Sequence, residues 1–243
     1  MSIKVVISQS MLFPWVGMLE QLRLADIFVH YDDVQFSKGG FVNRVQVKTA
    51  RGVEWMTVPL DDLHLGQRID EVRFASPSTW RQQHLDLLQR SLDGAPWCAD
   101  ALELAREVYA GDYPSIGALS RASMLALADY FGLRVGRTFV DVTDLQIGGA
   151  SSDRVLAVVK QQGADTYVTG HGASRYLDHL AFEREGIRVE YMNYRRLPYP
   201  QLHGAFTPHV TGLDLVANCG RAGIQYICSE TVPWRAFCSP GAV

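Results

Sequence analysis

The amino-terminal segment limits the fold class more than any other part of the sequence. Residues 3–8 (IKVVIS) form a short run rich in β-branched side chains, and residues 27–31 (IFVHY) form a second one. Between these runs, Trp15, Leu19 and Leu22 recur at three- and four-residue spacing, which is typical of a helix with one apolar face. A strand, a helix and a strand over roughly 30 residues make a βαβ unit, which needs parallel strands and a right-handed crossover. The sequence therefore predicts an α/β protein with a parallel sheet.

A β-hairpin and a group of helices are predicted to follow this unit. Residues 41–48 and 55–60 alternate in polarity on either side of a loop at residues 50–52, which is typical of a β-hairpin. Residues 68–74 are predicted to add a short strand. Apolar stripes separated by prolines predict one helix that begins at residues 76–78 and two more at residues 99–109 and 115–131.

Strands and helices alternate again in the second half of the chain. Strands are predicted at residues 137–140, 166–169 and 187–192, and helices at residues 151–160, 173–180, 211–218 and 221–227. Residues 234–243 are predicted to lack regular structure. Together these elements predict one α/β domain over residues 1–243, with a parallel Rossmann-like sheet, a β-hairpin insertion and a helical lobe at about residues 76–132.

Charge, hydropathy and cysteine spacing disfavour several functional classes. The 23 lysines and arginines against 26 acidic residues give a net charge of −3, which disfavours a broad nucleic-acid-binding surface. No stretch reaches the roughly 18 apolar residues that a membrane span needs, and the amino terminus lacks the pattern of a secretory signal. The four cysteines lack the spacing of zinc ligands, so no metal site is predicted. We expect a cytoplasmic protein with reduced thiols.

Three polar segments directly follow predicted strands, where ligands bind in an open parallel sheet. Residues 9–17 lead into the start of a helix, whose free backbone N–H groups favour an anion. Residues 32–44 combine acids, amides and cations, and residues 170–176 place glycines between a strand and a helix. With nearby Lys48 and the loop residue His203, the candidate substrate-binding residues are Gln9, Trp15, Gly17, Asp32, Gln35, Asn43, Arg44, Lys48, Gly170, Gly172, Ser174, Tyr176 and His203. Polar turns with solvated side chains are the alternative interpretation.

The candidate catalytic residues are Asp33, Lys38 and His171. Adjacent side chains on a strand point to opposite faces, so at most one of Asp32 and Asp33 is expected to face a shared cavity, unless the strand has already ended before them. A carboxylate or a loop histidine can take a proton from an amine, and a lysine can bind an anionic group. Cys219 could act as a nucleophile, although a small buried thiol is the more common environment for cysteine.

Taken in order along the chain, these and further motifs resemble the WbqC-like family of bacteria. The motifs are Gln9 with Pro14-Trp15-x-Gly17, Asp32-Asp33-Val34-Gln35-Phe36-Ser37-Lys38, Asn43-Arg44, Val47-Lys48-Thr49, Trp55-x-Thr57-Val58-Pro59, Gly163-Ala164-Asp165-Thr166-Tyr167, Tyr176-Leu177-Asp178, Pro200-Gln201-x-His203-Gly204, Leu213-Asp214-Leu215 and Asn218-Cys219-Gly220. The resemblance implies a cytoplasmic tailoring protein of surface-polysaccharide or natural-product biosynthesis. It also implies a transferase or ligase that places a glycyl or related acyl group on an amino-sugar or other small amine.

The amino-terminal unit is also similar to the nucleotidylyltransferase-like α/β enzymes. Pantothenate synthetase, one of these, joins a carboxylate to an amine through an acyl-adenylate. That similarity implies ATP with magnesium as cofactor, but the family's H-x-G-H turn is Trp15-Val16-Gly17-Met18 here and keeps only the glycine.

Several alternatives for partners and activity stay open. The expected partners are a small-molecule amine acceptor and an activated acyl donor, while the acidic net charge disfavours aminoacyl-tRNA as that donor. A protein that binds a nucleotide-sugar or a carrier without catalysis is the non-enzymatic alternative. A homodimer is the default oligomeric expectation.

Overall fold

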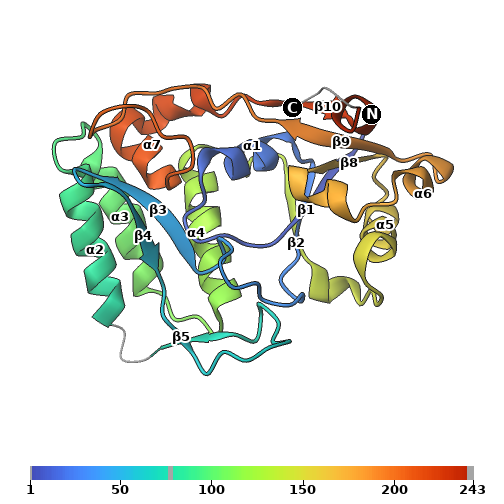
Figure 1. Ribbon diagram of the computed structural model, residues 1–243, viewed down its shortest axis with the longest axis horizontal. Helices are drawn as coiled ribbons and strands as arrows, with labels where there is room; N and C mark the ends of the chain where they lie inside the picture. Colours follow the sequence, from blue (N-terminus) through green and yellow to red (C-terminus); the bar gives the residue numbers. More distant parts are fainter. Residues whose placement is uncertain (1, 76–78, 240–243) are drawn as a thin grey trace.

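A computed structural model describes residues 2–75 and 79–239 of the chain. Its centre is a six-stranded sheet in the order β10–β9–β8–β1–β2–β7 (Figure 1). The strands are β1 (Lys4–Ser8), β2 (Ile27–His30), β7 (Thr138–Asp141), β8 (Thr166–Thr169), β9 (Arg188–Asn193) and β10 (Glu230–Pro233). Neighbouring strands are parallel except β10, which runs antiparallel to β9. The predicted parallel Rossmann-like sheet is confirmed.

The order of the strands reverses at β1. Read from β7, the sheet contains its third, second, first, fourth, fifth and sixth strand along the chain, which is the doubly wound arrangement. Val6 of β1 lies beside Phe28 of β2 on one side and beside Val168 of β8 on the other. The loops after β1 and β8 therefore leave neighbouring strands in opposite directions, which creates a crevice at the carboxyl edge of the sheet.

Helices cover both faces of the sheet (Figure 1). They are α1 (Val16–Leu24), α2 (Thr79–Leu92), α3 (Cys98–Ala110), α4 (Ile116–Tyr130), α5 (Ser151–Gln161), α6 (His179–Arg184), α7 (Gly212–Cys219) and α8 (Trp234–Phe237), with 3₁₀ turns η1 (Val142–Leu145), η2 (His171–Arg175) and η3 (Gly220–Tyr226). Among the described residues, no helix has the length and apolar character needed to cross a membrane.

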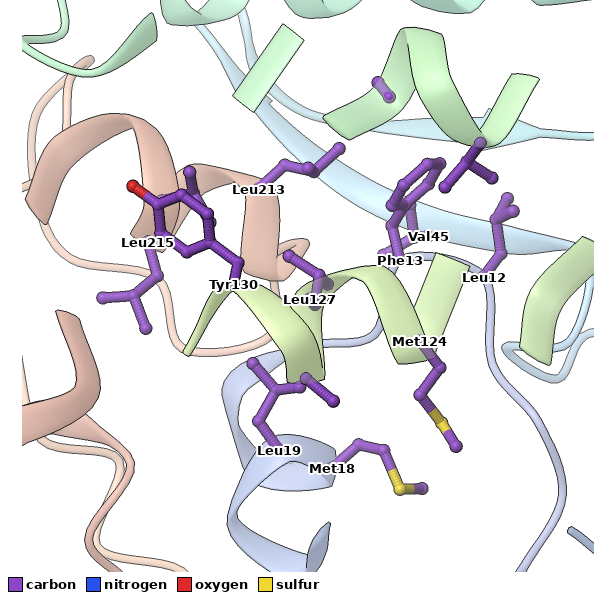
Figure 2. Packing of buried hydrophobic residues seen from close by; sticks show 14 of the residues in the cluster. Leu12, Phe13, Met18, Leu19, Val45, Met124, Leu127, Tyr130, Leu213 and Leu215 are labelled. Atoms are coloured by element: carbon purple, nitrogen blue, oxygen red, sulfur yellow. The ribbon is translucent and has the colours of Figure 1, made fainter. Parts of the chain in front are cut away.

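Alternate residues of β1 belong to different cores. Val6 packs in the larger core with α1, α4 and α7, whereas Val5 and Ile7 pack in a second core with α5 and α6. This division follows from the two-residue period of a strand. Figure 2 shows how Leu19 of α1 and Leu127 of α4 contribute to the larger core beside α7. Both faces of β1 are therefore buried, which explains its unbroken apolar sequence.

The predicted β-hairpin is confirmed. Strands β3 (Arg44–Thr49) and β4 (Gly52–Thr57) pair antiparallel, with Thr49 opposite Gly52 across the turn. Val45 and Met56 are buried and attach the hairpin to the larger core. Beyond the hairpin, β5 (Leu60–Asp61) pairs with β6 (Arg73–Phe74), so the strand predicted over residues 68–74 is confined to its last two residues.

Two helix predictions for the second half of the chain are wrong in detail. The helix predicted at residues 173–180 is the 3₁₀ turn η2 followed by α6, because the Asp178 side chain accepts a hydrogen bond from the Ala181 N–H and starts a new helix. The helix predicted at residues 221–227 is the 3₁₀ turn η3. Its tight winding brings Gly223 so close to Leu215 and Phe131 that a Cβ atom would lie 3.0 Å from each.

The end of the chain contains structure that was not predicted. Residues 230–233 form strand β10 and residues 234–237 form helix α8, and Val232 and Trp234 pack against the second core. The predicted helix start at residues 76–78 lies outside the described residues, and so do residues 240–243.

Candidate functional site

A cavity of about 370 Å³ lies at the carboxyl edge of the sheet, between the segment that follows β2 and the first turns of α5. Its lining residues are Tyr31, Asp33, Val34, Gln35, Gly149, Ala150, Ser151, Arg154, Val155 and Tyr176. Three of the predicted site residues, Asp33, Gln35 and Tyr176, thus meet in one cavity although they come from two separate loops. Its position is the one in which doubly wound sheets bind ligands.

An ion pair between Asp33 and Arg154 forms one wall of this cavity. Arg154 Nη1 donates to Asp33 Oδ1 at 2.9 Å, and Arg154 Nη2 donates to Oδ2 at 2.5 Å. The Arg154 Nε–H donates to the Ile147 carbonyl, and the guanidinium lies 4.9 Å from the ring centroid of Tyr31. The hydrogen bonds to Asp33 raise the pKa of Arg154 above its ordinary value. These contacts therefore fix the Arg154 guanidinium against Asp33 and favour its charged form.

Arg154 was not identified as a site residue from the sequence. It occupies the fourth position of α5 and is buried beside Val155 and Val158. An arginine within the apolar face of a helix needs a charged partner, because an isolated buried charge is strongly unfavourable. This pattern in the sequence could have indicated that Arg154 is buried with an acidic partner, but it does not identify Asp33 as that partner.

Asp32 points away from the cavity, toward α4. Its carboxylate accepts hydrogen bonds from the Ser10 N–H at 2.8 Å, from the Ser10 hydroxyl at 2.7 Å and from Arg121 Nη2 at 3.0 Å. Burial raises the pKa of Asp32, and these hydrogen bonds offset part of that effect. The two adjacent acids therefore face different ways, although β2 ends at His30, so the strand geometry on which that prediction rested does not extend to them. Asp32 ties the loop after β1 to α4, and its oxygens are engaged by protein groups, which corrects its assignment to substrate binding.

A row of aromatic side chains lies at the same edge of the sheet, around Tyr194 at the end of β9. The Tyr194 ring lies 5.1 Å from Trp15 and 5.1 Å from His171, and its hydroxyl accepts a hydrogen bond from Gln21 at 2.7 Å. A Cβ atom at Gly17 would lie 2.2 Å from the Trp15 indole, so glycine lets this ring fold back over the start of α1. Trp15, Gly17 and His171 thus meet near the point where the strand order reverses.

The orientation of His171 leaves one ring nitrogen free. Its Nε2 lies 2.7 Å from the Met192 carbonyl, which can only accept a hydrogen bond, so Nε2 carries the proton and Nδ1 is an acceptor. The Ser174 hydroxyl donates to the His171 carbonyl. Gly170 lies next to the Tyr194 hydroxyl, and Gly172 is exposed. His171 lies outside the cavity lining, but Tyr176, at the end of the same loop, is part of that lining.

Other predicted site residues are placed elsewhere. Asn43 Nδ2 donates to the Val58 carbonyl, so this amide holds the end of the hairpin. Arg44 donates to the Gly39 and Gly40 carbonyls and lies 4.1 Å from the Trp55 ring centroid. Lys38 is exposed in the same loop, and Gln9 is half-buried after β1. The structure therefore does not bring Asn43 or Arg44 to the cavity.

Lys48 and His203 fix the loop at residues 201–205 and are not part of the cavity lining. Lys48 is buried, and its Nζ donates to Gln201 Oε1 at 3.1 Å and to the Gly204 and Ala205 carbonyls at 3.0 and 2.7 Å. An ammonium has three N–H donors, so none is left for a substrate anion. His203 Nε2 likewise lies 2.8 Å from the Ser91 carbonyl. The predicted substrate-binding role of Lys48 is corrected to a structural one.

Replacing Lys48 by methionine is expected to lower the free energy of unfolding by about 2 kcal/mol, because the loop loses three hydrogen bonds to a charged group. We also expect faster hydrogen exchange at the Thr207 N–H, which donates to Gln201 Oε1. Urea denaturation and amide exchange measure the two effects. Lys160→Met, at a half-exposed lysine, is the control and should change stability little. Unchanged Thr207 exchange would show that Lys48 does not hold this loop.

The remaining chemistry of the site disfavours a cysteine nucleophile and a magnesium site. Burial raises the pKa of the Cys219 thiol to about 11, so it stays protonated near neutral pH. Asp32 and Asp33 are each paired with an arginine, and the positive charge of that arginine opposes the binding of a divalent cation at the carboxylate. Among residues 2–75 and 79–239, no three His, Cys, Asp or Glu side chains gather closely enough to hold a metal ion. The residues present do not fit magnesium–ATP.

Comparison with known proteins places the chain in a family. The model of the WbqC-like protein family matches residues 9–226. The chain belongs to the WbqC-like protein family. This WbqC-like chain is 29% identical over 227 residues to the uncharacterized protein Rv1507c of Mycobacterium tuberculosis, an alignment that covers 92% of this chain and 97% of that protein. No solved structure matches the chain.

Proposed function

We propose that this WbqC-like protein is an enzyme that forms an amide by transferring a glycyl or related acyl group to a small amine, such as an amino-sugar. The observation that carries the proposal is the cavity at the carboxyl edge of the Rossmann-like sheet, with the Asp33–Arg154 ion pair in its wall. A volume of about 370 Å³ suits a small molecule.

The polar groups of this edge suit an amine substrate. Arg154 occupies one position on each oxygen of Asp33, and a carboxylate offers about four such positions, so an ammonium can still bind there. An amine must lose a proton before or during its attack on an acyl carbon. His171 has the free Nδ1 lone pair that this step requires. Asp33 would orient the amine, and His171, which lies outside the cavity lining on the same loop as Tyr176, is the proposed general base.

The proposed step transfers an acyl group from a donor that is already activated. The amine nitrogen attacks the acyl carbon of a thioester or ester, the bond from that carbon to sulfur or oxygen breaks, and the amine proton passes through His171 to the leaving group. Among the described residues, Asp32 and Asp33 are each paired with an arginine and are therefore poor ligands for magnesium, which favours a transferase over an ATP-dependent ligase. Exposed Lys38, after β2, remains the candidate contact for an anionic part of the donor.

A search for the product tests this proposal. The purified protein is incubated with an amine acceptor, either glucosamine or L-alanine, and with one of three donors: a glycyl thioester, glycyl-tRNA, or glycine with ATP and magnesium. Mass spectrometry is expected to find the acceptor plus one glycyl residue with the thioester. Product with glycyl-tRNA that disappears after ribonuclease treatment would change the donor class. Bound but unaltered acceptor with every donor would contradict an enzyme and support a binding protein.

A further inference from the structure

The cavity presents one negative and one positive group side by side. Asp33 and Arg154 are the charged residues in its lining, and the rest of that lining is neutral. The two side chains are only 13% and 10% exposed. Because bulk water screens buried charges poorly, each charge acts strongly on a molecule inside the cavity.

Both members of the pair keep hydrogen-bonding capacity for a ligand. A guanidinium has five N–H donors, and the contacts of Arg154 with Asp33 and with the Ile147 carbonyl use three of them. Asp33 retains lone pairs that Arg154 does not occupy. The aromatic ring of Tyr31 under the guanidinium holds Arg154 in place, which reduces the entropy lost when a ligand binds.

This arrangement discriminates against molecules with a single charge. A simple amine bound to Asp33 would lie close to the positive Arg154, and a simple anion bound to Arg154 would lie close to the negative Asp33. A molecule that carries both charges satisfies both groups at once. The hydroxyl groups of Tyr31 and Tyr176 add no charge, because burial raises the pKa of each.

We infer that the cavity binds a zwitterion, with its ammonium against Asp33 and its anionic group against Arg154. An α-amino acid is the simplest molecule of this class, since its two charges are as close together as those of the ion pair. The zwitterion would be the acceptor in the acyl transfer proposed above. This acceptor role, unlike the binding itself, rests on the proposed function. Arg154 holds its carboxylate, so its amine is the group that remains to be acylated.

Two matched sets of probes test the inference without any variant. The first set is L-alanine, ethylamine and propionate, in which the second and third molecules each lack one charge. The second set is L-phenylalanine, 2-phenylethylamine and 3-phenylpropionate. Calorimetric titration is expected to show that at least one amino acid binds about tenfold or more tightly than both of its analogues. If neither amino acid binds more tightly than its singly charged analogues, the inference is wrong.

Matched variants locate the binding. Asp33→Asn and Arg154→Lys are each expected to weaken amino-acid binding by about tenfold or more. Asp165→Asn makes the same change in an exposed aspartate that is paired with Arg188 at the amino end of β8, and should leave binding unchanged. Tight binding that survives Asp33→Asn would place the amino acid elsewhere and overturn the inference.

The binding measurement can be distinguished from the test of the proposed reaction. Amino-acid binding is measured without an acyl donor, so it can be observed even if no amide forms. Conversely, an amide that forms on ethylamine as readily as on L-alanine would contradict the zwitterionic acceptor but leave the acyl transfer intact.

Discussion

Replacing Arg154 by methionine is expected to lower the free energy of unfolding by about 3 kcal/mol, within the range measured when one partner of a buried ion pair is removed. The reason is that the Asp33 carboxylate, 13% exposed, would lose its one ion-pair partner among the described residues. The loop before α5 would also lose the hydrogen bond from Arg154 to the Ile147 carbonyl. Urea denaturation at neutral pH measures the change.

The double variant separates the ion pair from the packing of the arginine side chain. Asp33→Asn combined with Arg154→Met removes both charges, and it should recover much of the stability that Arg154→Met loses. Arg235→Met, in the exposed pair with Glu183, is the control and should have a small effect. A loss below about 1 kcal/mol for Arg154→Met would mean that the pair behaves as a solvated surface pair.

Asp214→Asn is expected to stabilise the protein above about pH 6 and to have little effect below about pH 4. Asp214 is buried in the first turn of α7, and its Oδ1 has no hydrogen-bond partner. Burial raises the pKa of its carboxyl to about 6, an effect that nearby Lys48 and Tyr199 partly offset. The ionised carboxylate of Asp214 therefore lowers the stability of the folded protein.

The direction of the pH dependence follows from the two states of the chain. In the unfolded chain the pKa of an aspartate is about 3.9. Because the folded-state pKa is higher, the folded protein binds the proton more tightly, and ionisation of Asp214 lowers stability. This penalty is absent below about pH 4, grows as the pH rises toward 6, and is complete above it, where it amounts to about 2–3 kcal/mol.

The difference in unfolding free energy between wild type and Asp214→Asn, measured from pH 4 to pH 8, tests this dependence. The difference should rise with pH and level off above about pH 6. Asp144→Asn, at an exposed aspartate, should show a flat difference over the same range. A flat difference for Asp214→Asn as well would show that its carboxyl is not perturbed in the folded state.

Local patterns were enough to predict most of the sheet. Runs such as residues 3–8 and 166–169 are β-branched and lie next to apolar helical stripes, so each element is specified by its own residues. Strand β10 is different. Its four residues become a strand by pairing with β9, whose sequence is remote, and a proline at its end obscures the pattern.

Local rules could predict little of the candidate site. Asp32 and Asp33 do face different ways, but β2 ends at His30, so the two-residue period of a strand does not extend to them. Their orientations follow from tertiary partners, Arg121 for Asp32 and Arg154 for Asp33. The partner of Asp33 lies 121 residues further along the chain, so no spacing rule identifies it. Lys48 illustrates the same limit, because a lysine after a strand resembles an anion ligand until its contacts with residues 201–205 are known.

The rate of acyl transfer by the Asp33→Asn variant, with the donor and acceptor found in the product search, tests most directly whether the reaction occurs at the cavity. The substitution preserves the size of the side chain and removes the charge that orients the amine. A loss of about 100-fold or more is expected, with wild-type activity in the Asp165→Asn control. An Asp33→Asn protein that unfolds cooperatively and transfers acyl groups at the wild-type rate would contradict the assignment of the cavity as the active site.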